Sequence, residues 1–193
     1  MSSGMKMVEV KALLGQLRHD SQSPEEKEKL LLAMDLFEFV FETGQNLDFK
    51  EYRKNLDLKG PPLAIASFET REEAMAWLNA HPNPPDGAKV LIAGEYHYVA
   101  WFPELGNRRL PRSPILPYYL EDLASEGLLP PVATFDTYEE AKAWVDSQSE
   151  PPRQVFILIA GEYHLVAYHY RLNLRAIYPM SLAAKSEPEG EDG

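Results

Sequence analysis

The heptapeptide Leu-Ile-Ala-Gly-Glu-Tyr-His occupies residues 91–97 of this 193-residue sequence and recurs at 158–164. Outward from it, the stretch 66–101 matches 133–168 without a gap at a constant offset of 67, and 19 of the 36 pairs are identical. Identity this high over this length indicates an internal duplication. We therefore expect the fold to contain one structural unit twice.

Each copy begins with a short apolar run typical of a β-strand, Leu63–Phe68 in the first copy and Val132–Phe135 in the second. Thr70–Glu73 and Thr137–Glu140 then show the threonine-to-glutamate pattern of a helix capping box. We predict that a short helix starts at each box.

The two predicted helices carry matching apolar stripes, and we interpret Trp77 and Trp144 within them as core residues. Proline pairs follow at 84–85 and 151–152, where a helix cannot continue because proline lacks the amide hydrogen. An apolar strand begins a few residues later in each copy.

Glycine sits at the same place in both heptapeptides, followed by glutamate, at 94–95 and 161–162. A glycine in the first position supplies the positive φ of a type II′ turn, so we predict a two-residue hairpin loop at each pair. Weaker matches at the same offset, such as Arg108 against Arg175, indicate one further strand per copy.

This order of elements predicts an α+β fold. An N-terminal helical segment is followed by two tandem β-α-β-β(-β) repeats that form a pseudo-symmetric mixed sheet with helices packed on it. The predicted regions are 1–60 (helical), 61–116 (repeat 1), 117–130 (linking helix), 131–182 (repeat 2) and 183–193 (disordered acidic tail). The pattern leaves open whether the repeats share one sheet or form two that face each other.

The first sixty residues carry helical patterns. Ser23–Glu26 places a capping serine before a proline, so it predicts a helix start. The apolar residues of Leu30–Phe41 form so wide a stripe that we predict a core helix buried on more than one side, ending at Thr43–Gly44. We expect a weaker helix at Met5–Arg18 and a short helix starting at Asp48–Glu51.

Composition excludes several classes of protein. Nineteen basic against thirty acidic side chains give a net charge of −11, which disfavours nucleic-acid binding and favours either solubility alone or a basic partner. The absence of cysteine excludes disulfides and thiolate metal sites. The sequence shows neither a secretory signal nor an apolar run of about 20 residues, so we expect a cytoplasmic protein without membrane contact.

The one ionisable cluster that repeats is Glu95 with His97, and Glu162 with His164. Each histidine could act as a general base or metal ligand oriented by its glutamate. Against this, the predicted turn places the glutamate in the loop and His97 opposite Ile92 at the rim of a core. We interpret the histidines as structural and expect no catalytic residue, cofactor or metal ion.

Several aromatic residues interrupt the repeat pattern, among them Tyr118, Tyr119 and Tyr138. Buried aromatics fill cores, whereas exposed ones are frequent anchors at protein interfaces. These three are the candidate partner-binding residues.

Four segments of the chain resemble a multi-copy paralogous family of small acidic myxobacterial proteins. They are the helix end at 34–45, Phe-Lys-Glu-Tyr at 49–52, ASFETREEAMAWL at 66–78 and VLIAGEYHYV at 90–99. Members of this family are often labelled "head protein". The resemblance spans nearly the whole chain and implies no catalytic residues. Small acidic proteins expanded within one lineage also resemble immunity proteins of toxin systems.

The function we expect is therefore non-enzymatic protein binding, with a basic toxin as the partner that an immunity protein would neutralise. A phage-derived structural or assembly protein is the alternative. An enzyme built on the Glu-Tyr-His pairs is a third and weaker one.

Overall fold

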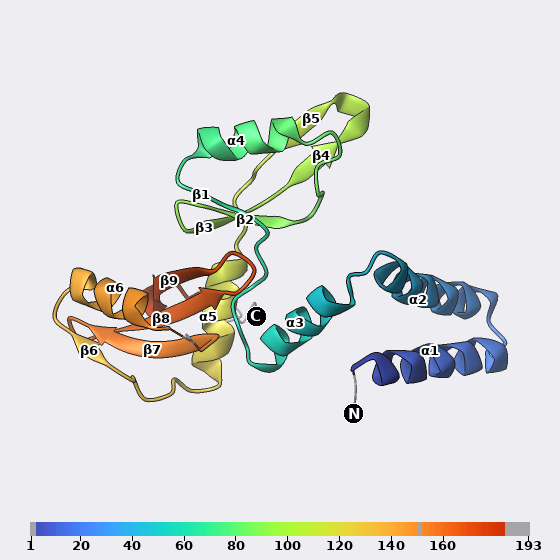
Figure 1. Cartoon of the computed structure of the whole chain (residues 1–193), viewed down its shortest axis with the longest axis horizontal. Coiled ribbons are helices and arrows are strands. Elements are labelled where there is room, and N and C mark those ends of the chain that lie inside the picture. Colours follow the sequence, from blue (N-terminus) through green and yellow to red (C-terminus); the bar gives the residue numbers. More distant parts are fainter. Residues whose placement is uncertain (1–2, 150–151, 184–193) are drawn as a thin grey trace, which may run out of the picture. The chain divides into compact units, whose positions relative to one another are not determined.

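The computed structural model describes residues 3–149 and 152–183, and its fold is mixed α+β with the helices first (Figure 1). The chain divides into two compact units, Met1–Asp57 and Leu58–Gly193. Of the predicted acidic tail, everything from residue 184 on lies outside the described residues, as does Pro151 of the second proline pair.

The first unit contains α1 (Ser3–Asp20), α2 (Pro24–Glu42) and α3 (Asn46–Asp57). The hydroxyl of Ser23 accepts a hydrogen bond from the Glu26 amide at 3.3 Å, which confirms the predicted start of α2. The helix ends one residue before Thr43, as the sequence predicts.

The prediction that α2 is buried on more than one side is wrong within this chain, since none of its residues is buried in the described structure. Its main contact partner is α1, where Gly15 faces Met34 and Lys11 pairs with Glu38. A hairpin gives each helix one neighbour, whereas the apolar residues of α2 point to several sides.

The second unit holds the two duplicated copies. Each has a parallel strand, a helix and an antiparallel hairpin. The first copy has β1 (Ser67–Phe68), α4 (Arg71–Ala80), β2 (Lys89–Ile92) and β3 (Glu95–Tyr98), and the second has β6 (Thr134–Phe135), α6 (Tyr138–Ser147), β7 (Gln154–Ile159) and β8 (Glu162–His169).

Strand pairing repeats between the copies at the sequence offset of 67. Ser67 pairs with Leu91 between β1 and β2, and Thr134 pairs with Leu158 between β6 and β7. The capping box is complete at Thr70 in α4. In α6 one of the two capping-box hydrogen bonds is present, in which the Thr137 hydroxyl accepts from the Glu140 amide. The Glu140 carboxylate accepts instead from the backbone amide of Asp136.

Both predicted hairpins are confirmed, but the predicted loop position and turn type are wrong. The two loop residues are Ala93–Gly94 in one copy and Ala160–Gly161 in the other, all with φ between 49° and 84°. Two consecutive positive φ values define a type I′ turn, whose twist matches that of the strands. Moving the loop by one residue changes each cross-strand partner by two, so His97 lies opposite Val90 rather than Ile92.

The strands form three sheets, ordered β1-β2-β3, β4-β5 and β6-β7-β8-β9, so the two copies do not merge into one mixed sheet, which the sequence pattern had left open. The additional strands predicted after each hairpin are β5 (Asn107–Arg109) and β9 (Leu174–Pro179), while β4 spans Ala100–Phe102. Two 3-10 turns, Pro103–Leu105 and Met180–Leu182, follow β4 and β9.

Helix α5 (Ile115–Ser125) connects the copies and begins two residues before the predicted Pro117. Its buried residues Leu116, Leu120 and Leu123 join one core cluster with residues from both copies. Two further clusters lie between α4 and the first sheet and between α6 and the second. In these, Trp77 and Trp144 are half-buried at the edge of the core rather than within it.

None of the helices in the described part of the chain combines the length and apolarity needed to cross a bilayer.

Candidate functional site

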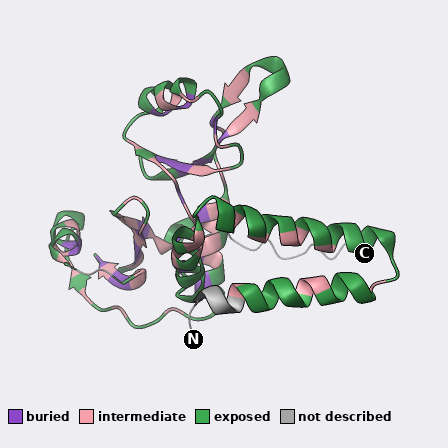
Figure 2. Cartoon of the chain, turned by 45° about the vertical axis from the view of Figure 1, so that its right-hand side comes forward, coloured by how far each residue is buried: buried purple, intermediate pink, exposed green. Residues whose placement is uncertain are grey.

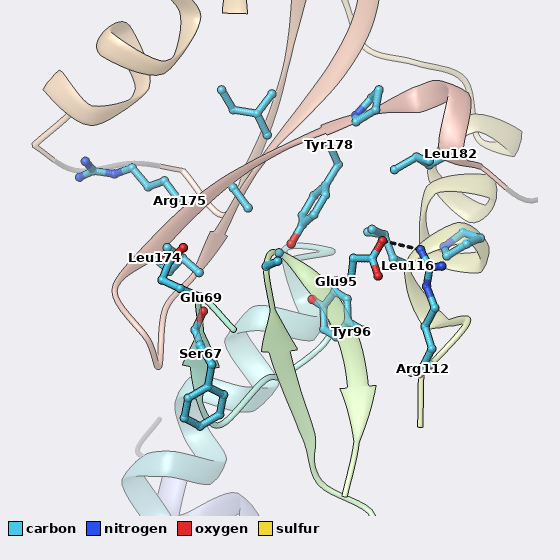
Figure 3. Close-up of a pocket in the computed structure, with 18 of the residues that line it drawn as sticks. Ser67, Glu69, Glu95, Tyr96, Arg112, Leu116, Leu174, Arg175, Tyr178 and Leu182 are labelled. Carbon is cyan, nitrogen blue, oxygen red and sulfur yellow. Dashed lines mark hydrogen bonds and ion pairs between the residues drawn. The ribbon is translucent and has the colours of Figure 1, made fainter. Parts of the chain in front are cut away.

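An open groove of about 740 Å³ lies in the second unit, between the two copies (Figure 3). The first copy contributes β1, the hairpin turn and the segment leading into α5. The second contributes the start of α6 and strand β9. The groove is built from segments far apart in sequence, because it forms where the copies meet around α5.

Strand β9 lines the groove along its whole length. It is the last strand of its sheet: β8 pairs with one edge of it, and no described strand pairs with the other. An unpaired strand edge presents backbone amides and carbonyls that can bind a further extended segment. The groove can therefore accept a peptide in strand conformation.

Charged residues of both signs surround the groove. Arg112 donates to the Glu95 carboxylate at 2.5 Å, and Figure 3 shows this pair beside α5. Both side chains are more than half exposed, so the pair adds little to stability and can exchange for a ligand contact. Glu69 also lines the groove, whereas Lys142 pairs with Asp146 on its own helix.

Arg175 lines the groove with its stem and uses its guanidinium within the fold, donating to the backbone oxygens of Asp146 (3.1 Å) and Gln148 at the end of α6. Arg108 does the same for α4, donating to the backbone oxygens of Asn79 and His81 at 3.0 Å each. Carbonyls at a helix C-terminus carry partial negative charge, so each arginine stabilises the helix of its own copy. This contact explains why arginine occupies both positions.

Two tyrosines from different copies form the floor of the groove. Tyr96 donates from its hydroxyl to the backbone oxygen of Pro62 at 2.8 Å, and Tyr178 shares a hydrogen bond of 3.1 Å with Nε2 of His169. The Tyr96 and His169 rings lie 5.9 Å apart. Figure 3 shows the Tyr178 side chain reaching from β9 toward the hairpin of the first copy.

Burial keeps this cluster uncharged at neutral pH. It raises the pKa of the Tyr96 and Tyr178 hydroxyls above their usual range, and for Tyr96 the nearby Tyr178 hydroxyl adds to the effect. Burial also lowers the pKa of His169 to about 4. A general base for neutral pH needs a pKa near 7, so these groups are poorly matched to proton transfer and fit a structural role.

The groove contains two of the residues singled out from the sequence, Glu95 and Tyr138. Tyr138 is 49% exposed at the start of α6. Tyr118 is exposed on α5 but does not line the groove. The hydroxyl of Tyr119 bonds internally, donating to the backbone oxygen of Lys59 at 2.8 Å.

The histidines of the Glu-Tyr-His motif do not line the groove. Nδ1 of His97 lies 3.2 Å from the backbone oxygen of Glu95, and Nδ1 of His164 lies 3.0 Å from that of Glu162. A backbone carbonyl thus orients each ring, while the Glu95 carboxylate pairs with Arg112. The described residues contain no group of three or more histidines or acidic residues placed to hold a metal ion.

No sequence pattern indicated Arg112, Tyr178 or the free edge of β9. Arg112 and Tyr178 lie outside the matched stretches 66–101 and 133–168. Whether an edge of β9 stays unpaired depends on the order of strands in the sheet, which is set by the tertiary structure. Comparisons with family models, with curated proteins and with solved structures find no match to this chain.

Proposed function

We propose that this chain is a non-enzymatic, cytoplasmic protein-binding protein that neutralises a basic toxin by holding an extended segment of it in the groove. The observation that carries the proposal is the unpaired edge of β9 along the groove wall. Backbone pairing would supply affinity, and side-chain pockets on the groove floor would supply specificity.

The charge of the chain supports a basic partner. A net charge of −11 accelerates association with a positively charged protein. At the groove itself Glu69 is the acidic group for such a partner, since Glu95 is paired with Arg112. Tyr138 adds an exposed aromatic anchor of the kind that dominates binding energy at interfaces.

We also propose that the two copies are a pseudo-symmetric pair of β-α-β-β(-β) repeats derived from one ancestral unit. The equal strand registers and the matched contacts of Arg108 and Arg175 with their helices support this relation. The groove would then be a product of the duplication, because a single unit has only one of its walls.

The test begins with the product of the neighbouring gene, co-expressed with this chain or used as bait. A basic partner should bind, and its toxicity should be relieved. Replacing Tyr138→Ala should weaken binding about 10-fold or more, as expected when an interface anchor is truncated. Failure to find a partner or to relieve toxicity would contradict the proposal.

A charge reversal with a matched control locates the interface. Glu69→Lys in the groove should slow association with the basic partner, whereas Glu104→Lys, which lies in the 3-10 turn after β4 and does not line the groove, makes the same change in net charge. Equal effects of the two variants would show that overall charge, and not the groove, governs binding.

The alternative, a phage-derived assembly protein, is favoured by one observation, the exposed apolar surface of the first unit. An assembly protein should form large oligomers by itself, because repeated head-to-tail contacts generate either rings or open filaments. A purified chain that stops at a small, defined oligomer would contradict this alternative.

A further inference from the structure

The helical hairpin of α1 and α2 leaves most of its apolar side chains uncovered. Figure 2 shows both long helices exposed along most of their length. Eight large apolar side chains of the two helices are between 40% and 62% exposed, and six of them follow one side of their helix: Val10, Leu13 and Leu17 on α1, and Leu32, Leu36 and Phe39 on α2. Single exposed apolar residues are ordinary, but a contiguous set of this size marks an interaction surface.

These six residues form two stripes with the spacing of a helix interface. The α1 stripe (Val10, Leu13 and Leu17) advances by three and then four residues, and the α2 stripe (Leu32, Leu36 and Phe39) advances by four and then three. This is the repeat that places side chains along one seam of a helical bundle. Neither stripe is the face that the hairpin already uses, where Gly15 meets Met34.

The charges of the two helices identify what covers the stripes. Helix α1 carries three Lys or Arg and two acidic residues, whereas α2 carries two Lys and six acidic residues. A basic partner would be complementary in charge to α2 but not to α1, and an acidic partner would be complementary to α1 but not to α2. A second copy offers α2 to α1 and α1 to α2, which repeats the pairing that Lys11 and Glu38 make within one hairpin.

We propose that two copies of this chain associate through their α1–α2 hairpins into a four-helix bundle. In this bundle the α1–α2 turns of both copies lie at the same end. Each α1 therefore packs between the α2 of its own chain and the α2 of the other copy. All neighbouring helices are then antiparallel, which is favourable for their dipoles, and the two-fold axis closes the assembly at a dimer.

The two helices are long enough for this role. They contain 18 and 19 residues, and a stable interface draws on about 20–30 residues from each partner. A two-helix hairpin with a single buried seam is marginal by itself, because isolated helices gain most of their stability from packing. The dimer also accounts for the sequence of α2, whose apolar residues on several sides demand burial that the α1–α2 hairpin does not provide.

Sedimentation equilibrium on the full-length chain tests the proposal. The parent should be a dimer at micromolar concentration. Leu13→Glu and Leu36→Glu should each weaken self-association about 100-fold, because each buries a charge in an apolar seam. The control Leu105→Glu makes the same change at a residue that is 76% exposed in the second unit, and it should remain dimeric.

Two results of this experiment would overturn the proposal: a parent that is monomeric at every concentration, or stripe variants that associate as tightly as the parent. Circular dichroism on each variant distinguishes loss of association from loss of helix. If the parent chain is monomeric and its helix content rises only when another protein is added, the two stripes bind that protein rather than a second copy.

Cross-linking tests the arrangement without destabilising the seam. The chain has no cysteine, so single replacements are unambiguous. Leu13 and Leu32 each lie about two helical turns from the end of the helix at the connecting turn. Mixed Leu13→Cys and Leu32→Cys chains should cross-link to each other more than either does to itself. Preferential cross-linking of Leu13→Cys to itself would exclude the proposed packing of α1 against α2. This test does not involve the groove, so its failure leaves the proposed function standing.

Discussion

The two duplicated copies share more than half of their matched residues and yet build different sheets. In the second copy, β7 and β8 are six and eight residues long, and β9 pairs along β8 from His164 to His169. In the first copy, β2 and β3 are four residues each, and the chain after Tyr98 leaves the sheet to form β4 with β5. Identical hairpins therefore do not determine how far a sheet extends.

The difference begins where the copies differ in sequence, at Asp86 and Gly87 against Arg153 and Gln154. Gly87 has φ of 74°, which no extended strand allows, and the Asp86 carboxylate accepts the amide of Trp101 at 2.9 Å. In the second copy Gln154 is in regular strand conformation and pairs with Ala167. One glycine and one acidic side chain thus end the first sheet early, while the second sheet continues and supplies the edge strand of the groove.

The largest expected difference between the copies concerns the matched leucines Leu91 and Leu158. Leu91 is fully buried in the cluster around α5, and Leu158 is half-buried. Leu91→Ala should cost about 2–5 kcal/mol of unfolding free energy, and Leu158→Ala clearly less, because a cavity forms fully only at a closed site. Urea unfolding followed by tryptophan fluorescence reports on the second unit, since all three tryptophans lie there. Equal costs would show that the copies are packed alike.

A pH effect should belong to the second copy alone. His169 is buried, whereas its counterpart in the first copy is the half-exposed Phe102. The pKa of His169 is about 4 in the folded protein and 6.5 for the free side chain. Between these pH values the imidazole therefore takes up a proton in the unfolded state but not in the folded state. This contribution to stability is complete above pH 6.5 and is lost as the pH falls toward 4, by about 3 kcal/mol in total.

Unfolding free energies of parent and variant, compared at pH 7 and pH 4.5, measure this effect. His169→Gln should flatten the dependence relative to the parent. Tyr178→Phe removes the hydroxyl at 3.1 Å but leaves the ring of His169 buried, so it should keep the dependence. If Tyr178→Phe also flattened it, the hydrogen bond rather than burial would control the protonation of His169.

The smallest expected effect comes from exchanging the residues at which the sheets diverge. Gly87→Gln should cost about 1–2 kcal/mol, because a side chain disfavours positive φ although the space beside Gly87 is open. Gln154→Gly should cost about 0.5–1 kcal/mol through the greater freedom of the unfolded chain. A stabilising Gly87→Gln would indicate that the first sheet can extend like the second.

Local signals predicted much of the fold. Ser23, Thr70 and Thr137 cap helices as expected, because a hydroxyl and the amide three residues on lie within one turn of chain. Both hairpins are where the repeated glycine indicates. The loop was misplaced by one residue because Ala93 adopts a positive φ, which sequence propensities for alanine do not favour.

The candidate site could be predicted only in part. Glu95 and Tyr138 were singled out as a repeated acid and an aromatic residue that breaks the repeat, and both line the groove. Tyr178 and Arg112 carry no comparable signal, because their importance comes from neighbours far away in sequence. The cross-strand partner of His97 likewise differs by two residues from the expected one, because the loop lies one residue earlier.

The sequence by itself determined the duplication, the starts of the three capped helices, the two hairpins and the acidic charge, because each depends on residues close together in the chain or on composition. The tertiary structure decided which strand was left with a free edge, that α5 joins the copies around a groove, and that the α1–α2 hairpin buries no residue of α2. These features depend on which surfaces meet, and burial is a property of the assembled structure rather than of any single segment.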